Sequence, residues 1–268
     1  MGSPGGHGDR DLRRRIRRVA SLLTILTPRE IRLRYRENAL DMAWVLITPV
    51  AVMIVYGIVL TQSLDVEASC SPYLSSAWTG LVIWTFFATA LGTASWSLLS
   101  SSALIGKVYF PREAIPLAVV GATLLDLAVG TVTILLVALF QGVDLSLVAL
   151  TALPALAMLA VWTAALCIFT SVLAVFLRDV TQAVQLFLRV GFFATPVMYE
   201  PSLLPAAFEW TATVNPLAVA IAGVRQPVLC GVAPEWGPLL AQLVIGSILL
   251  VLAVLYVRSV ESRMTDVL

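Results

Sequence analysis

The 268-residue sequence is poor in charge and has one histidine and one lysine, and these shortages exclude several classes of protein. Charged residues make up 12% of the chain, hydrophobic residues make up 59%, and the mean hydropathy is +0.94. Soluble globular domains carry roughly 25% charged residues. His7 lies in a glycine-rich segment, and there is no HExxH, GxSxG or clustered Cys/His pattern. We therefore expect an integral membrane protein that is not an enzyme, with no catalytic residue, metal site or cofactor site of its own.

A phosphate-binding P-loop is also missing. Lys107 follows Gly106, but the motif G-x-x-x-x-G-K-[ST] also needs an upstream glycine and a following Ser or Thr, and neither is present. The chain is therefore not expected to bind ATP through a P-loop.

Long apolar runs predict an all-α fold with six transmembrane helices. An uncharged run of about 20 residues is long enough to cross the roughly 30 Å hydrocarbon core as a helix, and continuous runs are not typical of a barrel. The apolar segment after the fifth run is broken by prolines, so we expect short re-entrant helices near the outer surface there, at about 200–238. The predicted spans are 43–61, 77–100, 115–140, 145–177, 184–199 and 239–256.

The distribution of basic residues predicts the orientation, because Lys and Arg are retained on the cytoplasmic side near span ends. Of the 17 basic residues, ten precede the first span and five more fall on the same side of the later spans. The opposite side carries acidic residues and a single base, Arg225. We expect a multi-pass protein of the plasma (inner) membrane with both termini in the cytoplasm.

The expected organisation is a basic cytoplasmic tail at 1–18, an amphipathic interfacial helix at 19–41 and a membrane domain at 42–268. The arginine run in the tail favours an anchor against anionic membrane lipids over a twin-Arg signal or a nucleic-acid patch, so no nucleic-acid partner is expected. Thr27 can cap a helix, Pro28 fits a first turn and Glu30 completes a capping box. Such a helix is expected to lie in the membrane interface, with packing on a partner as the alternative.

Two ionisable residues, Asp126 and Arg189, fall within predicted spans, where each costs roughly 2.5–3.5 kcal/mol if it is central. Asp126 is expected to be buried against Thr123, Thr131 or a neighbouring helix. Arg189 can either snorkel to the cytoplasmic headgroups or line a polar path. The aromatic residues of the spans could stack on sugar rings, although a lipid-facing belt or helix packing is the simpler interpretation of any one of them.

The three cysteines divide between the outer side and the membrane. Cys167 falls within a span, where packing explains it. Cys70 and Cys230 are both predicted on the outer side, where two thiols can pair if their loops meet but can also remain free. A disulfide between Cys70 and Cys230 is therefore a candidate.

A charged loop at 104–117 joins the second and third predicted spans in a chain that is otherwise poor in charge. An ordinary solvated loop is the simple interpretation. A docking element for a partner would explain why charges gather here and why Pro111 and Pro116 limit the flexibility of the loop. The candidate docking residues are Lys107, Tyr109, Phe110, Pro111, Arg112 and Glu113.

Four groups of residues carry a resemblance to a known transporter family. They are Arg34-Tyr35-Arg36 with Trp44, Pro49 and Tyr56; Phe110-Pro111-Arg112-Glu113 with Pro116; Arg178-Asp179-Val180 with 195–199; and 202–205 with Asn215-Pro216-Leu217 and Arg225. From Arg29 onward the chain resembles the membrane subunit of type-2 ABC exporters, which move O-antigen, teichoic acid and galactan polymers. Asp41 departs from the pattern, since many relatives carry a small residue there, and the departure leaves the entry angle of the first span open.

The resemblance implies a homodimer whose 104–117 segment is a coupling helix. Two copies of a separate ATPase subunit would dock there, and that subunit would bind ATP and Mg. The implied cargo is a polyprenyl-linked polysaccharide, most like the cell-wall galactan of actinobacteria, with a drug or a small lipid as the alternative. A secondary transporter would show inverted repeats and midplane ion ligands, and a membrane transferase would need clustered acids or histidines; the sequence has neither pattern.

The resemblance also implies site residues. Arginine binds phosphate through a planar fork of donors, and the candidates for contact with the lipid pyrophosphate are Arg32, Arg34, Arg36 and Arg189. The channel and gate candidates are Phe192, Phe193, Pro196, Tyr199, Asn215 and Pro216.

Overall fold

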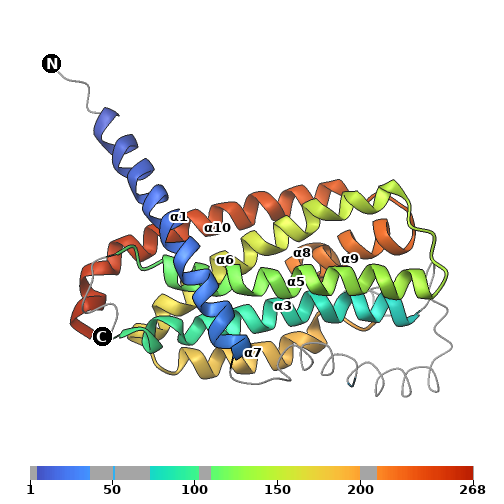
Figure 1. Ribbon diagram of the computed structural model, residues 1–268, viewed down its shortest axis with the longest axis horizontal. Helices are drawn as coiled ribbons and strands as arrows, with labels where there is room; N and C mark the ends of the chain where they lie inside the picture. Colours follow the sequence, from blue (N-terminus) through green and yellow to red (C-terminus); the bar gives the residue numbers. More distant parts are fainter. Residues whose placement is uncertain (1–4, 37–50, 52–72, 103–109, 200–209, 268) are drawn as a thin grey trace.

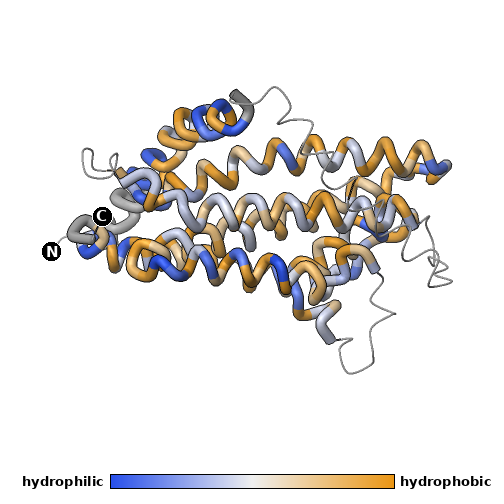
Figure 2. The backbone as a smooth tube through the Cα atoms, turned by 90° about the horizontal axis from the view of Figure 1, so that it is seen from below, coloured by the Kyte–Doolittle hydropathy of each residue, from blue (hydrophilic) through white to orange (hydrophobic). Residues whose placement is uncertain are grey.

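The computed structural model describes residues 5–36, 51, 73–102, 110–199 and 210–267 (Figure 1). Within these residues every regular element is a helix, which confirms the predicted all-α class. Apart from the first helix, the longer helices lie side by side along the longest axis of the molecule (Figure 1). Hydrophobic residues dominate along them (Figure 2), as expected for helices that cross a membrane.

Among the described residues, four helical segments are long and apolar enough to cross a membrane. They are α3 (Tyr73–Ser100), α5 (Ala114–Phe140), η1 with α6 (Leu147–Ala152 and Leu153–Phe176) and α10 (Trp236–Val267). These segments correspond to the second, third, fourth and sixth predicted spans. The first predicted span, 43–61, lies outside the described residues apart from Ala51.

The fifth predicted span, 184–199, is wrong in its bounds. The helix found there, α7, covers Val180–Ala194 and has 15 residues, so it is roughly 22 Å long at 1.5 Å per residue. It ends because Thr195 has an extended backbone, with φ −102° and ψ 139°, which is the conformation that a following proline favours. With this length, α7 alone is shorter than the hydrocarbon core of a bilayer.

Two short helices, α8 (Thr211–Val214) and α9 (Pro216–Leu229), lie in the segment for which re-entrant helices were predicted. Asn215 begins α9 by accepting a hydrogen bond on Oδ1 from the backbone N–H of Leu217, 3.0 Å away. Pro216 occupies the first turn, where its missing N–H is not needed. α9 packs against η1, α6 and α3, so this segment is built into the bundle.

The N-terminal helix α1 covers Gly5–Arg36 without a break. The predicted boundary at residue 18 and the predicted helix start at Thr27 are therefore wrong. Pro28 lies inside the helix, where it removes one backbone donor but does not end it. α1 packs on α5 and crosses the bundle obliquely (Figure 1).

α3 lies at the centre of the bundle, because most of its apolar part is buried, whereas most of the apolar parts of α5 and α10 are not. Its neighbours α5, α6, α7 and α9 surround it. The outer faces of α5 and α10 expose large apolar side chains, which suits contact with lipid tails. Most polar side chains on α3 are therefore surrounded by other helices and do not face bulk solvent by default.

The bundle has two distinct ends. At one end, which we call the basic end, α3, α6 and α10 finish and α5 and α7 begin, and Arg112, Arg178 and Arg258 lie there. The opposite end carries the connections after α5 and α9, with Asp144 and Glu235 exposed. The beginning of α1 and the end of α10 lie toward the basic end (Figure 1).

Candidate functional site

A row of hydroxyl groups follows one face of α3. Thr85, Thr89 and Thr93 are spaced four residues apart, so their side chains lie one above the other on the same face of the helix. Thr93 and Trp96 are exposed, although most of α3 is buried. The exposed part of the central helix is thus its hydroxyl-bearing face.

The neighbouring helix α7 carries a matching row of polar side chains. Gln182, Gln185 and Arg189 are all exposed, and their spacing of three and four residues places them on one face. A Cβ atom added at Gly92 of α3 would lie 3.2 Å from Nε2 of Gln185, so the row on α7 lies against α3 at Gly92, between Thr89 and Thr93 along the helix. We call the combined face of Thr85, Thr89, Thr93, Gln182, Gln185 and Arg189 the polar surface.

Exposed polar groups at membrane depth are unfavourable against lipid tails. The polar surface therefore suits water, a hydrophilic solute or a second copy of the chain. The structure places Arg189 among the exposed residues of this surface. A role in a polar path and snorkelling to the headgroups both stay predictions for this residue.

Two aromatic gate candidates on α7 have different surroundings. The ring of Phe192 packs edge-on against Trp84, with centroids 5.6 Å apart, and against Phe193, with centroids 5.3 Å apart. Gly191 allows this approach, since a Cβ there would lie 3.1 Å from the Trp84 ring. Phe193 is 66% exposed, so its ring remains accessible beside the polar surface.

Arg225 of α9 holds the segment that follows α7. Its Nε donates to the carbonyl of Ser76 at 2.9 Å, and its two Nη atoms donate to the carbonyls of Pro196, Val197 and Tyr199 at 3.3, 2.5 and 3.4 Å. The carbonyls of Pro196, Val197 and Tyr199 lie beyond the end of α7 and have no helical N–H partner there, and apolar surroundings supply no others. One planar guanidinium therefore satisfies the carbonyls of the non-helical segment after α7 and joins this segment to the first turns of α3.

The remaining gate candidates gather around the same segment. Asn215 Nδ2 donates to Thr195 Oγ1 at 2.9 Å, and Tyr199 donates its hydroxyl hydrogen to the carbonyl of Phe193 at 3.0 Å. Gln242 of α10 donates to the carbonyls of Thr213 and Val214 at 3.2 and 2.9 Å. The structure thus brings Pro196, Tyr199, Asn215 and Pro216 into one region, toward the end opposite the basic end.

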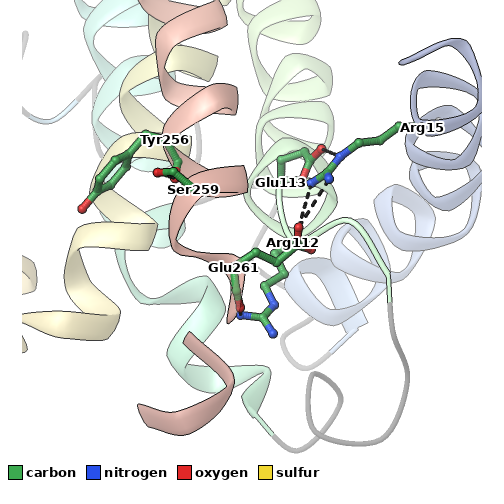
Figure 3. Close-up of polar contacts among 6 residues, drawn as sticks. All are labelled: Arg15, Arg112, Glu113, Tyr256, Ser259 and Glu261. Carbon is green, nitrogen blue, oxygen red and sulfur yellow. Dashed lines mark hydrogen bonds and ion pairs between the residues drawn. The ribbon is translucent and has the colours of Figure 1, made fainter. Parts of the chain in front are cut away.

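At the basic end, four residues form what we call the ion cluster: Arg15, Arg112, Glu113 and Glu261 (Figure 3). Arg15 contacts Glu113 through Nε at 2.7 Å and Nη2 at 2.8 Å, and contacts Glu261 through Nη1 at 3.3 Å. Arg112 donates to the backbone carbonyl of Glu261. The hydrogen bond to Glu113, with the charges of Glu113 and Glu261, raises the pKa of Arg15 above its ordinary value despite partial burial.

Arg112 and Glu113, which were predicted to contact the ATPase, have their charges held within this chain. They are 5% and 3% exposed, and both contact other parts of the same chain. Pro111 is buried and Phe110 packs against the apolar cluster at the basic end. Lys107 and Tyr109 lie outside the described residues.

A second ion pair fixes the far end of α1. Arg34 Nη1 lies 2.6 Å from Asp126 Oδ2 of α5. Asp126 was expected against threonines or an unspecified helix, and the structure supplies α1 as its neighbour. Of the other arginines predicted to contact pyrophosphate, Arg32 is exposed on α1, whereas the side chain of Arg36 lies outside the described part of the chain.

The cysteines agree with the prediction as far as they are described. Cys167 is a free, buried thiol, and Cys230 is disulfide-bonded. Cys70, the predicted partner of Cys230, lies outside the described residues. Their pairing stays a prediction, which labelling with a membrane-impermeant thiol reagent before and after reduction would test.

A polar surface on α3 and α7 of a multi-pass helical membrane protein is typical of transport proteins. The family model for the ABC-2 type transporter matches residues 21–229, and the chain belongs to this family. It is the permease subunit of a type-2 ABC exporter.

Curated relatives agree with this family. The chain is 29% identical, over 79% of its length and 81% of the relative, to an O-antigen export system permease protein RfbA of Klebsiella pneumoniae. It is 26% identical to a protein of the same description from Myxococcus xanthus, over 88% of this chain and 91% of the relative.

Sequence reasoning missed several residues of these sites. The i, i+4 spacing of Thr85, Thr89 and Thr93 was a legible signal for the polar face of α3. Gln182 and Gln185 gave a similar signal beside Arg189. In contrast, the pairs Arg15–Glu113 and Arg34–Asp126 join residues 98 and 92 positions apart, and nothing in a single sequence links them.

Proposed function

We propose that this permease moves a polyprenyl-linked polysaccharide from the cytoplasm to the outer side of the plasma membrane, driven by ATP hydrolysis on a separate subunit. The cell-wall galactan is the polymer we favour. The polar surface of α3 and α7 is the observation that carries the proposal. The relatives are described as O-antigen export permeases, which supports the same class of cargo.

The chemistry of the polar surface suits a glycan. Hydroxyl and amide side chains donate and accept hydrogen bonds as sugar hydroxyls do, and they can exchange partners as a polymer slides past. Phe193 and Trp96 are exposed and offer aromatic faces for sugar rings. A path for a drug or a small lipid would be lined mainly by apolar side chains.

The polar surface is open in one chain, so enclosing a path requires a second copy. Two copies related by a twofold axis would place both polar surfaces around a shared interior. We therefore propose a homodimer with two ATPase subunits. The basic end would face the cytoplasm and hold both termini, and the ATPase would dock on the coupling segment 104–117.

The lipid pyrophosphate needs basic contacts near the entry. Arg34 is already paired with Asp126, so Arg32 and Arg189, both exposed, are the first candidates among the described residues. Arg36 stays a candidate from the sequence. In this arrangement the lipid headgroup would meet α1 and the beginning of the polar surface on α7.

Reconstitution tests the proposal. The permease would be purified with its ATPase and placed in vesicles with polyprenyl-linked galactan, and the glycan reaching the opposite face would be measured with and without ATP. We expect ATP-dependent translocation that falls when Gln185 or Arg189 is replaced by Leu. ATP-dependent movement of a small lipid or drug, with no movement of any lipid-linked glycan, would overturn the proposed cargo in favour of the alternative.

A further inference from the structure

We propose that Arg15, Glu113 and Glu261 act as positioning residues, forming a clamp through which the coupling segment moves α1 and the end of α10 during transport. The inference rests on the proposed ATP-driven function and adds a route for the motion. It replaces the expectation that the charges after Phe110 are contacts to the ATPase.

The clamp joins three elements that are distant in the sequence. Arg15 lies on α1, Glu113 precedes α5, and Glu261 lies near the end of α10 (Figure 3). One guanidinium bridges both carboxylates, at 2.7 Å and 3.3 Å. Among the described residues, this is the one place where an ion cluster connects the first helix, the coupling segment and the last helix.

The clamp is shielded from water. The side chains of Glu113, Glu261 and Arg15 are 3%, 13% and 21% exposed. Ion pairs in such surroundings are stronger and less screened than pairs on an open surface. The contacts therefore resist separation when one of the three elements is displaced.

The clamp also sits where a displacement would arrive. The backbone N–H groups of Ala114 and Ile115 donate to the carbonyls of Pro111 and Arg112 at 3.1 and 3.3 Å, so the end of the coupling segment turns directly into α5. Arg112 donates to the backbone of Glu261 and adds a second link to α10. A shift of this turn carries Glu113 with it and thereby pulls on Arg15.

α1 can transmit the shift along its length because a second contact fixes its far end. Arg34 pairs with Asp126, and Thr27 faces Gly121, where an added Cβ would lie 2.9 Å from the threonine Oγ1. Both contacts are on α5. We therefore expect α1 and α5 to move as one body as long as the clamp is closed.

Vesicles containing the permease with its ATPase provide the test, with ATP hydrolysis and glycan translocation measured together. In Arg15→Gln and Glu113→Gln we expect hydrolysis to stay within about twofold of wild type while glycan moved per ATP falls by about tenfold, which corresponds to about 1.4 kcal/mol of coupling. Arg14→Gln is the matched control, since Arg14 is an exposed arginine of the same helix. If Arg15→Gln and Glu113→Gln moved as much glycan per ATP as Arg14→Gln, the clamp would be overturned.

A charge exchange separates the ion pair from mere packing. Arg15→Glu combined with Glu113→Arg would be made in a Glu261→Gln background, so that the reversed pair does not face a like charge. Glu261→Gln alone keeps the Arg15–Glu113 pair, so we expect it to retain more translocation per ATP than Arg15→Gln, and we expect the exchange to restore translocation per ATP to that level. Failure to restore it, with the complex still assembled, would overturn the proposal.

A measurement without cargo distinguishes failure of the clamp from failure of the proposed function. Spin labels at Ser21 of α1 and Leu124 of α5, both exposed, would report the distance between the helices, with buried Cys167 replaced by Ala. We expect a distribution that nucleotide leaves unchanged in the parent and broadens in Glu113→Gln. An identical distribution in both would overturn the clamp, whether or not any glycan is transported.

Discussion

At each end of the bundle an arginine side chain joins separate helices, but the groups that it contacts differ. At the basic end, Arg15 meets two carboxylates, so charge is balanced by charge. Toward the other end, the contacts of Arg225 given above are all with neutral backbone carbonyls. Ion pairs join whole elements that can move together, whereas the carbonyl contacts satisfy the non-helical segment that follows α7. The first arrangement suits transmission of movement, and the second suits a fixed break in a helix.

Removing Arg225 should have the largest effect, because it leaves several buried carbonyls without a donor. Arg225→Ala is expected to lower the free energy of unfolding by at least about 3 kcal/mol, since each unsatisfied buried group costs about 1–3 kcal/mol. Thermal unfolding of the detergent-solubilised protein would measure it. Arg178→Ala, at an exposed arginine of the basic end, is the control and should change stability by less than about 0.5 kcal/mol. Equal losses in both variants would contradict the role given to Arg225.

The close approach at Gly80 should give the next largest effect. A Cβ there would clash with the carbonyl oxygen of Val197 and lie 2.8 Å from Nη2 of Arg225. Gly80→Ala is expected to cost about 1–3 kcal/mol through overpacking. Gly237→Ala, where nothing lies within 4 Å of the added atom, is a control in the same protein. A Gly80→Ala protein as stable as the control would mean that the segment after α7 is not held tightly.

The sequence predicted most of what depends on local pattern. The apolar runs located α3, α5, α6 and α10, because a membrane helix must be apolar over its whole length. The end of α7 was misplaced because apolarity continues through Val197 and Met198, although Thr195 and Pro196 stop the helix. The prediction followed the apolar run, although a proline typically follows soon after the end of a helix.

Contacts across the fold were much less predictable. Arg112 and Glu113 look like solvated charges in the sequence, and only the arrival of α1 and α10 buries them. Asp126 was recognised as needing a partner, but several arginines could have provided one. The aromatic residues were predicted as a group, and only the structure separates packed Phe192 from exposed Phe193.

The pair Arg34–Asp126 tests whether the docking of α1 depends on charge at its far end as well as at Arg15. Asp126→Asn should cost about 1–2 kcal/mol, less than loss of a fully buried pair, because the Arg34 side chain remains 22% exposed. Hydrogen exchange of residues 5–36 would measure the loosening of α1, with Asp144→Asn, at an exposed acid of the opposite end, as the control. Unchanged exchange in α1 would show that apolar packing alone holds this helix on α5.

The smallest effect on stability, and the most specific effect on transport, is expected at the exposed ring between the two ends. Phe193→Leu should change the free energy of unfolding by less than about 0.5 kcal/mol, because the ring is exposed. Phe192→Leu should cost about 1 kcal/mol, since it removes the edge-on contact with Trp84. If the polar surface carries a glycan, Phe193→Leu slows translocation in vesicles without loosening the fold. A variant that transports glycan at the wild-type rate would remove Phe193 from the path and leave the polar side chains of α3 and α7 as its lining.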